Sequence, residues 1–324
     1  MESVIQFKNV TKKYRGKVAL NDVSYSVPKG VVFALLGDNG AGKTTSIKTM
    51  LGFVKPDKGH VSVLGLDSQK NDVEIRSRIG YVAEQPSFYD WMRVDEVGWF
   101  VAGVRGGQFF DEYRRQIEQF KIPMTNKISE LSKGMKAKVA LAVATSHDPE
   151  ILILDEPTSG LDPMVRREFM ESMVDRAATG KTVFLSSHQL NEVERVADYV
   201  AMIKDGNLLF TESLNELKEN ISELSIAVSE AGVPLPKLPG AIIHCEKRGR
   251  QWRVLAKDVG DDAISQIESQ EFVEHCSVKR PTLEEIFVGY LSENESGFQN
   301  KLREFDAREN SEAVNSTEET LPSS

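Results

Sequence analysis

The sequence lacks any long apolar stretch and has little cysteine. No apolar run in the 324 residues approaches the roughly 18 to 20 residues that a membrane-spanning helix needs, and the first residues do not form a secretory signal. We therefore expect the chain to stay in the cytosol. Cys245 and Cys276 are too few for a disulfide framework and too far apart for a clustered metal site, so both are expected to be inert thiols.

A surplus of basic charge is also missing. The net charge is −9, and residues 291–324 contain eight acidic against three basic residues. The rest of the chain is only mildly acidic, so nothing predicts a broad basic face for nucleic acid. The length allows one large domain and a smaller one.

A glycine-rich loop follows the apolar run Val31–Leu36, which is typical of a buried strand. A helix that begins at this loop would present free N–H groups to an anion. Lys43 would reach the β- and γ-phosphates of a nucleotide, and the Thr44 hydroxyl would lie on Mg²⁺. The predicted phosphate-binding loop consists of Gly37, Asp38, Asn39, Gly40, Ala41, Gly42, Lys43, Thr44 and Thr45.

Two carboxylates follow a second buried strand, Ile151–Leu154. Adjacent residues at a strand end point to opposite faces, so Asp155 is expected to hold the Mg²⁺ shell and Glu156 to orient water. His188 comes just after a further strand, 182–186, where a ligand role is favoured over a structural one.

Three further candidates have weaker local signals. Tyr14 precedes the phosphate loop and could stack on a base or pack on its own sheet. Gln85 ends a short strand, where its amide could reach a metal ion or remain an ordinary loop residue. Ser132 could cap a helix and, with Gly134, form a second anion-binding N-terminus, although any capped helix looks similar.

Aromatic residues are dense between residues 87 and 128, where the pattern is helical. We expect core packing for each of them individually. The alternative to core packing is an exposed docking patch for a partner, formed by Phe88, Tyr89 and Trp91.

Taken in order, these segments resemble the nucleotide-binding domain of ABC transporters: the A-loop, Walker A, Q-loop, signature, Walker B, D-loop and H-loop. The resemblance implies an α/β P-loop NTPase fold over residues 1–217, with a parallel core sheet, an antiparallel β subdomain and a helical subdomain. Two departures stand out. Asp38 replaces the usual proline of Walker A, and Lys133 and Met135 replace residues of the signature. We expect Asp38 to point outward, whereas Lys133 could face the nucleotide or lie on the surface.

The resemblance also implies a mechanism, in which two such domains close head to tail around two ATP molecules. Lys43, Thr44, Gln85 and Asp155 of one domain, with Mg²⁺, would face Ser132 and Gly134 of the other. Glu156 would act on water, and His188 and Gln85 would sense the γ-phosphate. The expected partners are an integral membrane permease and a second ABC ATPase subunit, in a homo- or heterodimer on the cytoplasmic side of the membrane.

The chain beyond residue 217 has a different character. Residues 218–290 predict a small α+β domain with four strands, and residues 280–287 resemble the C-terminal extension of ABC-2 exporter ATPases. Residues 291–324 are predicted to be a disordered acidic tail. The rival functions are a soluble ABC ATPase acting on ribosomes or DNA and a regulatory ATP-binding module. The charge balance argues against the first, and the intact Glu156 and His188 argue against the second.

Overall fold

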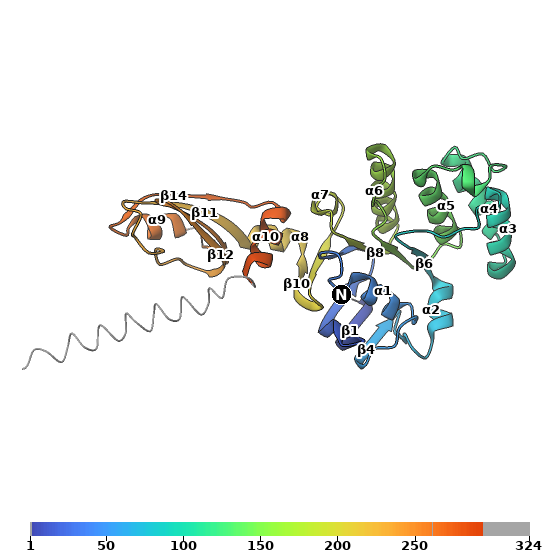
Figure 1. The fold of residues 1–324 in the computed structure, drawn as a ribbon, viewed down its shortest axis with the longest axis horizontal. Helices are drawn as coiled ribbons and strands as arrows, with labels where there is room; N and C mark the ends of the chain where they lie inside the picture. Colours follow the sequence, from blue (N-terminus) through green and yellow to red (C-terminus); the bar gives the residue numbers. More distant parts are fainter. Residues whose placement is uncertain (1, 261, 294–324) are drawn as a thin grey trace, which may run out of the picture. The chain divides into compact units, whose positions relative to one another are not determined.

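A computed structural model of the chain describes residues 2–260 and 262–293. The chain divides into two units, the first ending at Glu216 and the second beginning at Leu217, and each is described by itself (Figure 1). Within the described ranges, every helix is too short or too polar to cross a bilayer.

A six-stranded sheet forms the centre of the first unit. Its order is β10-β9-β3-β8-β7-β6, with β10 antiparallel to β9 and the other neighbours parallel. The inner strands are continuous apolar runs because both faces of the sheet are covered. The strands are β10 (Asn207–Ser213), β9 (Tyr199–Lys204), β3 (Val32–Leu36), β8 (Thr182–Ser187), β7 (Ile151–Asp155) and β6 (Ile79–Val82).

The register of this sheet brings three strand ends to one edge. Leu36 at the end of β3 pairs with Ser187 of β8, and Asp155 at the end of β7 pairs with Ser186. The loops that follow β3, β7 and β8 therefore start side by side, as expected for ligand sites at the carboxyl ends of parallel strands.

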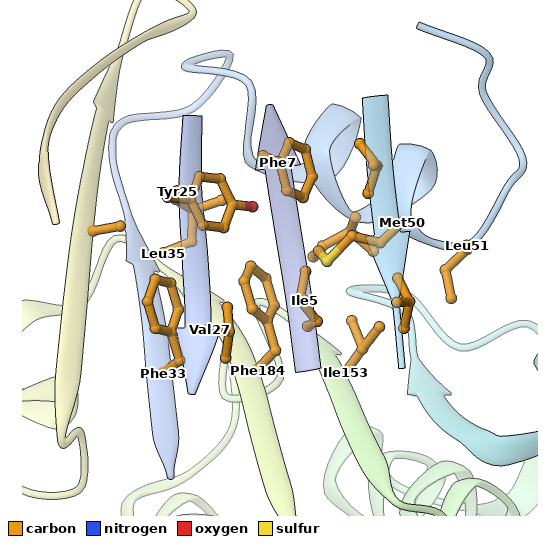
Figure 2. Close-up of a cluster of buried hydrophobic side chains, with 14 of the residues drawn as sticks. Ile5, Phe7, Tyr25, Val27, Phe33, Leu35, Met50, Leu51, Ile153 and Phe184 are labelled. Atoms are coloured by element: carbon orange, nitrogen blue, oxygen red, sulfur yellow. The ribbon is translucent and has the colours of Figure 1, made fainter. Parts of the chain in front are cut away.

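An antiparallel sheet of order β2-β1-β4-β5 completes this part of the first unit. Its strands are β1 (Ser3–Tyr14), β2 (Lys17–Pro28), β4 (Lys58–Val63) and β5 (Leu66–Asp67). Helix α1 (Lys43–Met50) contacts both this sheet and β7. Figure 2 shows the shared core, in which the rings of Phe7, Tyr25, Phe33 and Phe184 stack in sequence at centroid separations of 4.5, 5.8 and 5.6 Å.

The helical part of the first unit is made of α3 (Val94–Arg105), α4 (Phe109–Gln119), the short 3₁₀ turn Ile128–Glu130 and α5 (Lys133–Thr145) (Figure 1). Its core includes Phe109 and Tyr113. The expectation of core packing is wrong for four other aromatics, Tyr89, Trp91, Trp99 and Phe100, which are 64–67% exposed. The loop position of the first two and the outward face of α3 for the others explain this difference.

The remaining helices of this unit flank the main sheet. Helix α6 packs on β8 and β3, whereas α2 packs on β6. The bounds are α2 (Asp72–Arg78), α6 (Pro163–Ala178) and α7 (Leu190–Val193); α8 (Leu214–Asn220) crosses into the second unit.

The second unit is an antiparallel sheet of order β12-β13-β11-β14 with two helices. The elements are β11 (Ile221–Val228), β12 (Ala241–Arg248), β13 (Gln251–Lys257), α9 (Ala263–Glu268), β14 (Val273–Lys279) and α10 (Leu283–Glu293). Burial raises the pKa of the Cys245 thiol to about 11 and also raises the pKa of Cys276, so both thiols stay protonated near neutral pH.

The predicted start of the acidic tail at residue 291 is three residues too early. Helix α10 continues through Glu293, because the apolar residues near its end extend the helical pattern. Residues 294–324, where the rest of the predicted tail falls, lie outside the described residues.

Candidate functional site

The phosphate-binding loop borders a cavity of about 390 Å³ at the carboxyl edge of the main sheet. The loop lies between β3 and α1, as the sequence predicts. Asp38 is exposed yet lines the cavity, so it remains part of the phosphate site. The cavity is lined by Lys17, Ala19, Asp38, Asn39, Gly40, Gly42, Lys43, Thr44, Thr45, Glu84 and Glu156.

Two glycines let the loop approach its neighbours closely. Gly42 has φ of 120°, and a Cβ at this position would meet the Ala19 carbonyl oxygen at 2.5 Å. A Cβ at Gly37 would collide with the Ile203 carbonyl oxygen. Any larger residue would therefore displace the loop backbone.

Lys43 is buried and held by the loop itself. Its Nζ donates to the carbonyl oxygens of Gly37 at 2.7 Å and Asp38 at 3.2 Å. The same atom lies 3.0 Å from Glu156 Oε1, although the pair lacks hydrogen-bond geometry. An anion entering the cavity thus meets a fixed ammonium group that the protein already balances with one carboxylate.

Thr44 and Asp155 meet across the sheet edge. The Thr44 hydroxyl donates to Asp155 Oδ1 at 3.3 Å, and the Ser186 hydroxyl donates to the same oxygen at 2.6 Å. A hydroxyl beside a carboxylate suits Mg²⁺, which takes few protein ligands and completes its shell with phosphate oxygens and water. Among the described residues, no group of three His, Cys, Asp or Glu could hold a metal by itself.

The backbone turns away from the direction of β7 at Glu156, the residue after the end of this strand. Its φ of 47° is left-handed, and its N–H donates to the carbonyl and hydroxyl oxygens of Ser186, both at 3.1 Å. This turn, rather than strand alternation, separates the two carboxylates. His188 lies 2.8 Å from Glu156 Oε2 through Nδ1. Because an ionised carboxylate only accepts, Nδ1 of His188 carries a proton in this contact.

Ser132 and Gly134 lie apart from this cavity. Ser132 is exposed at the start of α5, and its hydroxyl accepts from the Met135 N–H at 3.2 Å. Gly134 is buried next to Val165 of α6. The Lys133 ammonium lies over Gly160, where any side chain would displace it.

Comparisons with known proteins now decide the family. The ABC transporter sequence profile matches residues 20–159, and the profile of the ATP-binding protein DrrA1-3-like C-terminal domain matches residues 213–291. The chain is 35% identical to the bacitracin transport ATP-binding protein BcrA of Enterococcus faecalis, over 72% of this chain and 77% of that protein. This chain belongs to the ABC transporter ATP-binding family.

Other relatives agree with this assignment. The Nod factor export ATP-binding protein I of Burkholderia orbicola is 34% identical over 72% of this chain and 77% of its own length. A solved ATP-binding subunit of an ABC transporter is 29% identical, with a TM-score of 0.62 over 67% of this chain and 92% of that one. The predicted fold and the prediction of an ATP-hydrolysing transporter subunit are confirmed, and the ribosome or DNA alternative gains no support.

Gln85 and Tyr14 of this ABC ATPase lie outside the lining of the phosphate cavity. Gln85 is exposed in the loop after β6, and its neighbour Glu84 lines the cavity instead. Tyr14 is 44% exposed at the end of β1, with the Lys12 ammonium 5.4 Å from its ring centroid. Neither side chain lines the phosphate cavity of this structure.

Three residues around the cavity were missed from the sequence. Ser186 looks like part of a buried strand, and its polar character at the strand end is the only signal for its bond to Asp155. Lys17 and Glu84 lie in segments that are remote from the phosphate loop along the chain. Only the tertiary fold brings them to the same cavity.

Proposed function

We propose that two copies of this ABC ATPase bind ATP head to tail between them. In this arrangement Lys43, Thr44 and Asp155 of one copy hold the phosphates, and Ser132 and Gly134 of the other copy close the site. The support is that Lys43 and Thr44 line one cavity and Asp155 contacts Thr44, whereas Ser132 is exposed at the N-terminus of α5 and neither it nor Gly134 lines that cavity. A helix N-terminus of this kind favours phosphate.

Within each site, Glu156 positions the attacking water or takes its proton. The Nδ1–H of His188 fixes the Glu156 carboxylate, and a proton on Nε2 would let the ring also donate to a γ-phosphate oxygen. Lys43 exchanges its contact with Glu156 for the phosphate oxygens, which releases the carboxylate for water. Mg²⁺ held by Thr44 and Asp155 supplies positive charge to the phosphates when bound.

Two family positions complete the nucleotide site. Tyr14 would stack on the base, because its exposed ring is accessible. Gln85 would reach the metal or the water only after the loop behind β6 rearranges, since Glu84 now lines the cavity. The loop phosphate contacts come from Gly37, Asp38, Asn39, Gly40, Ala41, Gly42 and Thr45.

The partner that converts hydrolysis into transport is a separate integral membrane permease, engaged from the cytoplasmic side. Exposed aromatic side chains in the helical part of the first unit support a docking role. Tyr89 and Trp91 stack at 5.7 Å between centroids, and Trp99 and Phe100 are equally exposed. Such apolar surface is typical of interaction sites. Because the relatives include a Nod factor export ATP-binding protein, we assign this chain to export.

The observation that carries the proposed hydrolytic role of Glu156 is its contact with both Lys43 and His188. We expect Glu156→Gln to slow ATP hydrolysis by about 10² to 10⁴ while ATP still binds, because the variant loses the general base but keeps the shape of the side chain. Phosphate release and equilibrium ATP binding measure the two effects.

The matched control is Glu150→Gln at the opposite end of β7, where Glu150 pairs with Arg78 at 2.7 Å. This variant should hydrolyse ATP at the wild-type rate. Near wild-type turnover by Glu156→Gln would remove Glu156 from its proposed role.

A further inference from the structure

Glu192 on α7 contacts two other segments of the first unit, one through each of its carboxylate oxygens. Oε2 accepts from the Thr158 hydroxyl at 2.6 Å, and Oε1 lies 2.8 Å from Nη1 of Arg166 on α6. The Glu192 side chain is only 13% exposed. The pair with Arg166 lacks hydrogen-bond geometry, so the Thr158 hydroxyl is the group that hydrogen-bonds this well-buried carboxylate, while Arg166 balances its charge.

The partners of Glu192 hold the loop that follows Glu156. Thr158 is 3% exposed, and its carbonyl oxygen accepts from the Leu161 N–H at 3.1 Å. Arg166 Nη2 donates to the Leu161 carbonyl oxygen at 3.2 Å. The loop is also tied to the catalytic residue, because the Ser159 N–H donates to the Glu156 carbonyl oxygen at 3.1 Å.

These contacts link the two segments that carry the predicted hydrolytic pair, Glu156 and His188. Glu156 binds His188 directly, and α7 begins at Leu190, two residues beyond His188. Glu192 then connects α7 back to Thr158, which lies two residues beyond Glu156. The Glu156 and His188 side chains are therefore held both by their own contact and by the Glu192–Thr158 contact behind them.

We propose that Glu192 is a positioning residue that keeps Glu156 and His188 aligned through Thr158. Glu192 does not line the nucleotide cavity, so it acts on this pair through its contact with Thr158 and not on the nucleotide itself. The inference rests on the proposed roles of Glu156 and His188. It adds a second tether between the loop after β7 and the helix after β8.

The test compares kcat and KM for ATP in the full-length chain. Glu192→Ala should lower kcat by about 10²-fold, the effect of misplacing a catalytic group by about 1 Å, while KM changes less than about two-fold. Thr158→Val should act in the same direction, and Thr158→Ser, which keeps the hydroxyl, should restore the rate. The double variant Glu192→Ala/Thr158→Val should be no slower than the slower single variant.

Glu171→Ala on α6 is the matched control, because its ion pair with Arg167 lies on the surface. Its kcat and melting temperature should equal those of the wild type. If Glu192→Ala does not fold, Thr158→Val and its Ser rescue carry the same test. A merely structural role would lower the melting temperature of folded variants without changing kcat at a permissive temperature, and this result overturns the inference.

A Glu156→Gln background separates this inference from the proposed function. Adding Glu192→Ala there should slow hydrolysis no further, because the group that Glu192 positions is already disabled. Fast hydrolysis by Glu156→Gln alone overturns the role of Glu156. Slow hydrolysis by Glu156→Gln together with normal kcat in Glu192→Ala overturns only the positioning role.

Discussion

The pairing of Lys43 with Glu156 is the central feature at the scale of single residues. Both side chains are nearly fully buried and lie 3.0 Å apart. A buried charge is costly unless it is paired, so each side chain stabilises the other before ATP arrives. In the proposed mechanism, incoming phosphate replaces Glu156 as the partner of Lys43 and frees the carboxylate to act on water. ATP binding and activation of the base would then be the same local exchange.

Ser186 should set the affinity of the metal site, because it is the second hydrogen-bond partner of the Asp155 carboxylate. We expect Ser186→Ala to raise the Mg²⁺ concentration for half-maximal hydrolysis by about 10 to 100-fold, as is usual for a lost partner of a metal ligand. Titration of ATPase activity with Mg²⁺ measures this effect.

Thr182→Ala is the matched control for Ser186. Thr182 lies at the other end of β8, where its hydroxyl accepts from the Gly30 N–H at 2.9 Å. The Mg²⁺ dependence of this variant should stay unchanged. An equal shift in both variants would attribute the effect to general loosening of β8.

At the scale of elements, the sequence predicts most accurately those segments that carry a strong local pattern. The apolar strands before Gly37 and Asp155 are found within a residue of their predicted bounds because burial on both faces requires continuous apolar runs. Helix α2 was missed because it is short and polar. Trp99 and Phe100 were misjudged because composition does not reveal which face of α3 is covered, and Tyr89 and Trp91 because they lie in a loop.

The predicted site residues also divide into those with a strong local pattern and those without one. Lys43, Asp155, Glu156 and His188 follow strands whose parallel order could be inferred, and the structure brings them together. Gln85 follows the edge strand β6 through a loop whose conformation no local pattern determines. Its role and those of Tyr14 and Ser132 stay predictions.

Helix α10 of the second unit is tied to its sheet by charge. Arg253 and Lys279 lie within 2.9 Å of Glu285 Oε1, and both also pair with the buried Glu223. Hydrogen bonds from Lys279 and the Thr282 N–H lower the pKa of Glu285 from 4.5 to about 2.

Because the folded pKa of Glu285 lies below its unfolded value, this carboxylate stabilises the unit above about pH 4.5, and the contribution is lost as the pH falls toward 2. Amide hydrogen exchange of α10 should therefore be faster in Glu285→Gln than in the wild type at pH 6, and the difference should shrink at pH 3. Glu284→Gln, on the same helix, is the control. A difference that does not depend on pH would show that charge is not what holds α10.

At the scale of the whole molecule, the proposed function gives each copy two complementary parts of a nucleotide site. Lys43, Thr44 and Glu156 line the cavity at the sheet edge, but Ser132 and Gly134 do not. If a second copy supplies them, hydrolysis requires both copies to close together. Closure of two subunits is then a movement that a permease can use.

Mixing two inactive variants tests this claim most directly. Lys43→Ala and Ser132→Ala chains should each be nearly inactive, but a mixed head-to-tail dimer has one site with both residues intact. Random pairing at equal concentrations should therefore restore about a quarter of the wild-type rate of phosphate release. Activity of the mixture that merely equals the average of the two separate variants would contradict a site shared between copies.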